Sequence, residues 1–139
     1  MNAKSLLIAS AIAVGLAMPA TAQQSTTMHR YAIFFKYTDQ AIKAMTDNPQ
    51  DREAATSKLS EAFGGKFEAL YFFPMQGEFD GFAIHQAPSD SAIEALAMAA
   101  RSTGAFVKGV VVPVITSGEF KTLMETAKQG AASFAQPGR

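Results

Sequence analysis

The chain has 139 residues, with 12 basic and 12 acidic side chains and a formal net charge of zero. This balance offers no electrostatic footprint for nucleic acid or anionic lipid, so we expect no nucleic-acid partner. Cysteine is absent, which excludes a thiolate nucleophile, a thiolate zinc site and a thiol redox centre.

The first 22 residues have the pattern of a secretory signal peptide. Lys4 is their only charge, residues 6–18 form an apolar run, and residues 20–22 are the small residues of a cleavage site. The apolar run is shorter than the roughly 20 residues that span a bilayer. We therefore expect cleavage after Ala22, a periplasmic or secreted location, and no membrane span in the mature chain.

The rest of the chain suits one domain with a short segment at each end. Residues 23–28 are polar, and residues 129–139 are weakly structured by composition. We expect them to be a flexible leader and a flexible tail. The domain itself is expected at residues 29–128.

The domain begins with a strand and an interrupted helix. Residues 30–37, RYAIFFKY, are aromatic and apolar with little alternation, which predicts a strand buried on both faces. Thr38 can cap a helix at residues 40–45, and Pro49 interrupts that helix. A second segment of helical spacing begins near residue 51 and ends at the glycine pair 64–65.

Two apolar stretches then predict a hairpin. Residues 66–75 form the second strand and residues 78–86 the third, with a turn at 76–77. Alternation in the second strand places four side chains on one face, namely Phe67, Ala69, Tyr71 and Phe73.

A helix, a strand and a second helix complete the domain. Residues 88–104 predict the first helix, and residues 105–116, rich in β-branched side chains, predict the fourth strand. Pro113 in that strand indicates an edge position or a bulge. The last helix is expected at about residues 117–128.

This order predicts an α+β fold, a ferredoxin-like βαββαβ sandwich with an extra C-terminal helix. Helices should cover one face of the sheet. The strands are too apolar for the other face to meet water, as five side chains show: Phe34, Phe72, Phe73, Phe82 and Phe106. We therefore expect a second identical chain to cover it, in a homodimer or a higher homo-oligomer.

The chain also resembles a known family, the GYD domain family, in three stretches at residues 31–43, 59–84 and 117–124. The Gly-Tyr-Asp signature of the family falls within Gly77, Glu78, Phe79 and Asp80. The resemblance implies a ferredoxin-like fold that pairs as a dimeric α/β barrel, and it implies little about function. Neighbouring superfamilies with that barrel include cofactor-independent monooxygenases, isomerases and haem-binding enzymes.

Asp80 is the first candidate site residue. We expect the first and third strands to be parallel neighbours, which would bring Asp80 level with Arg30 and Tyr31. A charge-assisted bond from Arg30, or from backbone donors near Gly77, would then give Asp80 a structural role. The alternative is general acid or base catalysis by this carboxylate.

A second candidate site combines three groups that the same topology brings to one end of the sheet: Lys36, His85 and Lys108. Such a cationic cluster beside aromatic walls would suit a small anionic or aromatic ligand. Tyr37 and Tyr71 could donate hydrogen bonds to that ligand. The alternative is that the lysines extend to solvent and His85 points outwards.

A metal site is not expected. With parallel strands, His29 and His85 would be separated by some five or six residues at about 3.3 Å each, too far to share a zinc ion. We expect no metal and no cofactor.

Two functions fit these patterns. The favoured one is a secreted, homo-oligomeric module that binds a small ligand or acts in assembly, without catalysis. The alternative is a cofactor-independent dimeric-barrel enzyme, monooxygenase- or isomerase-like, in which His85 or Asp80 transfers a proton.

Overall fold

A computed structural model of the chain describes residues 27–75 and 77–134. The expected signal peptide, most of the expected leader and the end of the tail lie outside the described residues. In the described part, no helix has the length and hydrophobicity that crossing a bilayer requires.

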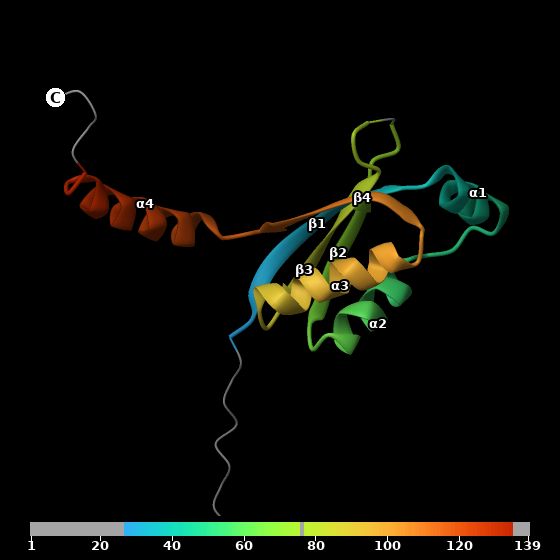
Figure 1. Cartoon of the computed structure of the whole chain (residues 1–139), viewed down its shortest axis with the longest axis horizontal. Coiled ribbons are helices and arrows are strands. Elements are labelled where there is room, and N and C mark those ends of the chain that lie inside the picture. Colours follow the sequence, from blue (N-terminus) through green and yellow to red (C-terminus); the bar gives the residue numbers. More distant parts are fainter. Residues whose placement is uncertain (1–26, 76, 135–139) are drawn as a thin grey trace, which may run out of the picture.

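The elements follow the expected order, with the interrupted helix present as two. They are β1 (His29–Tyr37), α1 (Asp39–Asp47), α2 (Glu53–Ala62), β2 (Lys66–Phe72), β3 (Gly81–Ala87), α3 (Asp90–Ser102), β4 (Phe106–Pro113) and α4 (Ser117–Ala131). The sheet has the order β2-β3-β1-β4, and every neighbouring pair is antiparallel. This is the ferredoxin-like α+β fold with an added helix (Figure 1).

The expected parallel pairing of β1 and β3 is wrong. These strands are antiparallel, with Tyr31 opposite His85 and Phe35 opposite Gly81. The α1–α2 crossover returns the chain so that β2 runs parallel to β1, and the β2–β3 connection then reverses it. The expected neighbours of Asp80 and His85 therefore change, because both were predicted from parallel pairing of β1 and β3.

The connection between β2 and β3 is longer than the expected two-residue turn. β2 ends at Phe72 and β3 begins at Gly81, so the residues of the expected motif at 77–80 lie in a loop. Gly81 is required where β3 starts. A Cβ there would lie 2.3 Å from the Tyr71 carbonyl oxygen and 2.8 Å from Phe35 Cζ.

β2 contains a bulge that moves Phe67 to the other face of the sheet. The pairing with β3 shifts between Phe67, which lies opposite His85, and Ala69, which lies opposite Ile84. The expectation that Phe67 shares a face with Ala69 and Tyr71 is therefore wrong, because the extra residue, Glu68, inverts the alternation.

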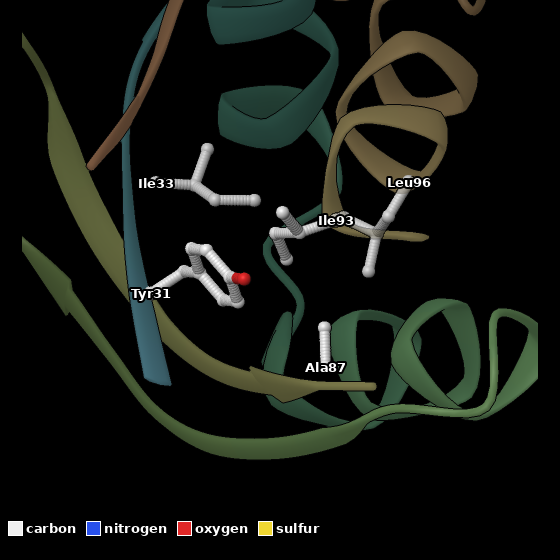
Figure 2. Close-up of a cluster of buried hydrophobic side chains, with 5 residues drawn as sticks. All are labelled: Tyr31, Ile33, Ala87, Ile93 and Leu96. Atoms are coloured by element: carbon white, nitrogen blue, oxygen red, sulfur yellow. The ribbon is translucent and has the colours of Figure 1, made fainter. Parts of the chain in front are cut away.

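The core lies between the sheet and the two helices that cover it, α2 and α3 (Figure 1). Tyr31 and Ile33 of β1 and Ala87 of β3 face Ile93 and Leu96 of α3 (Figure 2). The Tyr31 hydroxyl also donates a 2.5 Å hydrogen bond to Asp90 Oδ1, at the start of α3. Here hydrophobic packing and one hydrogen bond fix α3 on the sheet.

The last helix, α4, extends away from the sheet beyond the end of β4 (Figure 1). Thr116 caps it, and Glu119 completes a capping box. None of its residues is buried. Phe120, Leu123 and Met124 are each about half exposed, so the helix presents an apolar stripe that the described part of the chain leaves uncovered.

Candidate functional site

Asp80 is held at one end of the sheet through both its side chain and its backbone. The carboxylate accepts hydrogen bonds from the Tyr37 backbone N–H at 2.8 Å and from Lys36 Nζ at 3.1 Å. The Asp80 N–H donates to the Phe35 carbonyl at 2.8 Å, and the Asp80 carbonyl accepts from the Phe73 N–H at 2.7 Å. Asp80 therefore joins the ends of β1 and β2.

The partners expected for Asp80 are wrong, because β1 and β3 are antiparallel. Arg30 lies at the other end of β1, where its guanidinium forms two hydrogen bonds to Glu68, at 2.8 and 2.9 Å. The backbone at Gly77 provides an acceptor instead of a donor, since its carbonyl oxygen accepts from Lys36 Nζ at 3.1 Å.

Lys36 and Lys108 do meet, as a pair across β1 and β4. Each ammonium group binds an acid of the loop before β3: Lys36 binds Asp80, and Lys108 binds Glu78. Lys108 Nζ also lies 4.7 Å from the centre of the Phe79 ring. The two charges are thus neutralised by one loop instead of forming a cationic site.

His85 does not join these lysines, so the expected convergence of three cationic groups is wrong. His85 lies opposite Tyr31 and Phe67, roughly 16 Å along the strand from Lys36 at about 3.3 Å per residue. Its side chain lies on the face that the helices cover, whereas Lys36 lies on the open face. Antiparallel pairing and strand alternation together separate them.

The open face of the sheet carries an aromatic cluster. The Phe82 ring lies 5.4 Å from Phe34, 5.3 Å from Tyr71 and 5.9 Å from Phe73, measured between ring centres. Tyr71 is 57% exposed. Five phenylalanines were expected to be more than the helices could cover. Three of them, Phe34, Phe73 and Phe82, are in this cluster on the open face.

The other two, Phe72 and Phe106, pack on the helix side of the sheet. Phe72 and Phe106 each contact Phe35, with ring centres 5.8 and 5.9 Å apart. Tyr37 stacks on Phe106 at 4.8 Å. Tyr37 and Tyr71, which we expected at one ligand site, therefore lie on opposite faces.

His85 forms a buried pair with Ser60 of α2. The distance from Ser60 Oγ to His85 Nδ1 is 2.5 Å, and the two residues are 0% and 2% exposed. Burial lowers the pKa of His85 from 6.5 to about 4. The imidazole is therefore neutral at pH 7, and the hydroxyl is closed off from any substrate.

His85 also lines a cavity of the domain. Its ring is bonded to Ser60 through Nδ1, and the other ring nitrogen, Nε2, has no hydrogen-bond partner within residues 27–75 and 77–134. The neutral ring can offer this nitrogen as a hydrogen-bond donor or acceptor, depending on its tautomer.

That cavity, between the sheet and the helices, has a volume of about 610 Å³. Its apolar walls come from β1, α2, α3 and β4, and include Ile33, Phe35, Leu59, Leu96, Phe106 and Val111. The polar groups on its lining include His85, Tyr37, Arg52 and Arg101. An apolar space of this size with a few polar groups has the composition of small-molecule sites.

The two histidines are closer than the sequence predicted. His29 lies opposite Ala87 and His85 opposite Tyr31, so only two positions of register separate them across β1 and β3. The argument from a long separation is therefore wrong. Within the described ranges, no group of three or more His, Asp or Glu side chains could hold a metal ion.

The family profile described as GYD domain matches residues 31–124, which is more than half of the chain. The chain belongs to the GYD domain family. A comparison with curated proteins finds no match. In this GYD domain, the matched region contains the sheet from Tyr31 onward and all residues that line the cavity. It also contains the contacts of Asp80 and Glu78 with β1 and β4.

Sequence reasoning missed three residues of this GYD domain's candidate site: Arg52 and Arg101 on the cavity lining, and Ser60, the buried partner of His85. Ser60 is 25 positions from His85, and nothing in the spacing of the two predicts contact. Arg52 lies just before α2 and Arg101 in the last turn of α3. Helical periodicity could have assigned Arg101 to the side that faces the sheet, since Leu96, Ala97 and Ala100 lie on that side.

Proposed function

We propose that this protein is an exported, homo-oligomeric module that binds a small ligand without catalysing a reaction. The cavity between the sheet and the helices is the observation that carries this proposal. Its volume of about 610 Å³ is within the range of about 300–1,000 Å³ that is typical of small-molecule sites.

The surroundings of the candidate catalytic groups favour binding over turnover. Ser60 is fully buried, so its hydroxyl cannot attack a substrate. Burial lowers the pKa of His85 to about 4, which makes its neutral ring a weak base at pH 7. Asp80, the other candidate for proton transfer, is engaged by Lys36 and by the Tyr37 backbone.

Self-association is supported by apolar surface at two places. The open face of the sheet exposes Tyr71, Val110 and Val112 beside the aromatic cluster. The stripe of α4 is exposed as well, and a helix of 15 residues is only marginally stable in water without packing. A second copy could cover the open face as a partner sheet, forming the dimeric α/β barrel, and receive α4.

Export is the part of the proposal that rests on sequence alone. Residues 1–22 combine a charge, an apolar run and a small-residue cleavage site. N-terminal sequencing of the mature protein from a periplasmic or culture-medium fraction would test it. We expect the mature chain to begin at Gln23.

A pair of neighbouring alanines on α2 provides a test of the ligand site. Both alanines are exposed, but Ala55 lines the cavity and Ala54 lies outside it. Ala55→Phe should fill part of the cavity and weaken binding of a small aromatic probe, measured by isothermal titration calorimetry on the chain from residue 23. Ala54→Phe is the matched control and should bind like the unmodified protein. Equal binding by all three proteins would exclude this cavity as the site.

A further inference from the structure

We infer that the cavity selects a ligand with an aromatic body and one carboxylate group, whose charge is recognised by Arg52 and Arg101. This inference rests on the proposed ligand-binding function and names the chemical class of the ligand. It follows from which charged groups of the lining are free, where they lie, and what the walls offer to the rest of the molecule.

The two arginines line the cavity from different sides. Arg52 immediately precedes α2 and is half-buried. Arg101, in the last turn of α3, lies over β4, because its Cδ is 4.0 Å from the position that a Cβ on Gly109 would occupy. The cavity is thus lined by one arginine next to the start of α2 and by another at the end of α3.

Neither guanidinium is neutralised within the described part of the chain. The ion pairs of residues 27–75 and 77–134 use Arg30, Lys36, Lys43, Lys108 and Lys121 as their basic members. Arg52 is half-buried, so its guanidinium loses part of its hydration with no compensating charge, whereas Arg101 is exposed. A ligand carboxylate would supply that charge through paired hydrogen bonds.

Tyr37 adds a hydroxyl donor at the same place. Burial raises the pKa of Tyr37, and the charge of the neighbouring Arg52 opposes part of that rise. Arg52 and the Tyr37 hydroxyl are therefore close together on the lining. A guanidinium beside a phenol hydroxyl presents several donors to a single oxyanion.

The other charged residues on the lining do not change this preference. Lys108 directs its ammonium group to Glu78 and the Phe79 ring, on the open face. Glu94 is one carboxylate against two arginines, and it is exposed, as Arg101 also is. His85 is neutral at pH 7, because burial lowers its pKa to about 4. The charge preference therefore depends on Arg52 and Arg101.

The walls near these arginines favour a flat apolar body. Phe35, Tyr37 and Phe106 line the cavity together, with ring centres 5.2 Å apart for Phe35–Tyr37 and 4.8 Å for Tyr37–Phe106. Such edge and stacked arrangements accept a further aromatic ring in offset geometry. An aromatic carboxylate would use the rings and the arginines at once.

Two compounds of the same shape distinguish the contribution of the charge from that of the aromatic body. They are naphthalene-2-carboxylate, which is charged, and naphthalene-2-carboxamide, which is neutral. We expect the chain from residue 23 to bind the carboxylate about tenfold more tightly than the carboxamide in calorimetry at pH 7. Arg52→Gln and Arg101→Gln should each reduce this ratio, and the double variant should abolish it while keeping the affinity for the carboxamide. Lys58→Gln, on the exposed side of α2, is the control for net charge and should keep the ratio.

The possible results test the carboxylate preference separately from the proposed ligand-binding function. If both compounds bind equally and Ala55→Phe weakens both, the carboxylate preference is overturned and the cavity remains a ligand site. If Arg52→Gln and Arg101→Gln weaken both compounds by the same factor, the arginines contribute packing and the inference is again overturned. If neither compound binds, the inference and the ligand-binding proposal fail together.

Discussion

Asp80 accepts a 2.8 Å hydrogen bond from the backbone N–H of Tyr37, which ties the loop before β3 to the last residue of β1. The same carboxylate binds Lys36, and the Asp80 backbone bonds to both β1 and the end of β2. A residue within the GYD domain match thus closes one end of the sheet, next to the aromatic wall of the cavity.

Asp80→Ala should therefore destabilise the protein more than Lys36→Met. Removing the carboxylate leaves the Tyr37 N–H without its acceptor, which costs about 1–3 kcal/mol. Losing Lys36 removes a partly exposed ion pair (the two side chains are 38% and 25% exposed), worth at most about 1 kcal/mol. Urea unfolding of the two variants measures both values. Equal losses would show that the ion pair, not the backbone contact, is the important link.

Two glycines near this loop should respond very differently to alanine. At Gly81 an added Cβ would meet the Tyr71 carbonyl oxygen at 2.3 Å, whereas at Gly77 the nearest atom would be 3.8 Å away. Gly81→Ala should lower the free energy of unfolding by about 1–3 kcal/mol or more, because β2 and the Phe35 ring must both move away from the new methyl group. Gly77→Ala should stay within about 0.5 kcal/mol. Thermal melts of both variants provide the comparison, and similar melting temperatures would contradict it.

His85 should make stability depend on pH. Its pKa is about 4 in the folded protein against 6.5 as the ordinary value, so between these values the unfolded chain binds more protons. The stability that this residue supports is complete above about pH 6.5 and is lost as the pH falls towards 4, by up to about 3 kcal/mol.

The comparison protein for this effect is His85→Asn, whose amide can still bond to Ser60 but does not titrate. Its free energy of unfolding should change less than that of the unmodified protein between pH 7.5 and pH 4.5, in urea titrations at both values. Parallel pH profiles for the two proteins would contradict a neutral, buried His85.

Val110→Lys should disrupt self-association if the open face is the contact between copies. Val110 lies opposite Phe34 on that face and is 37% exposed, so a lysine there fits the monomer but places a charge in an apolar contact. Light scattering behind size-exclusion chromatography should find a dimer for the unmodified chain and a monomer for the variant. Ile42→Lys on α1, at 43% exposure, is the control and should remain dimeric. A monomeric unmodified chain would end the barrel proposal.

The amino-acid sequence by itself determined the order of the elements and several of their ends. Thr38 caps α1 by accepting a hydrogen bond from the Ala41 N–H, as its position before the helix predicts. Gly64 and Gly104 have the positive φ of helix C-terminal caps, 71° and 74°. Pro113 lies on β4, an edge strand. These features depend on neighbours within a few positions, so a local pattern is sufficient.

Only the tertiary structure decided which side chains meet. One reversal at the β2–β3 connection makes β3 antiparallel to β1, which moves His85 along the sheet away from Lys36 and brings Asp80 to Lys36. The bulge at Glu68 places Phe67 on the opposite face of β2 from Ala69. The contact of Ser60 with His85 joins a helix to a strand. Strand direction and register result from packing over the whole sheet, and a shift of one residue exchanges its two faces, so spacing along the chain does not determine the site.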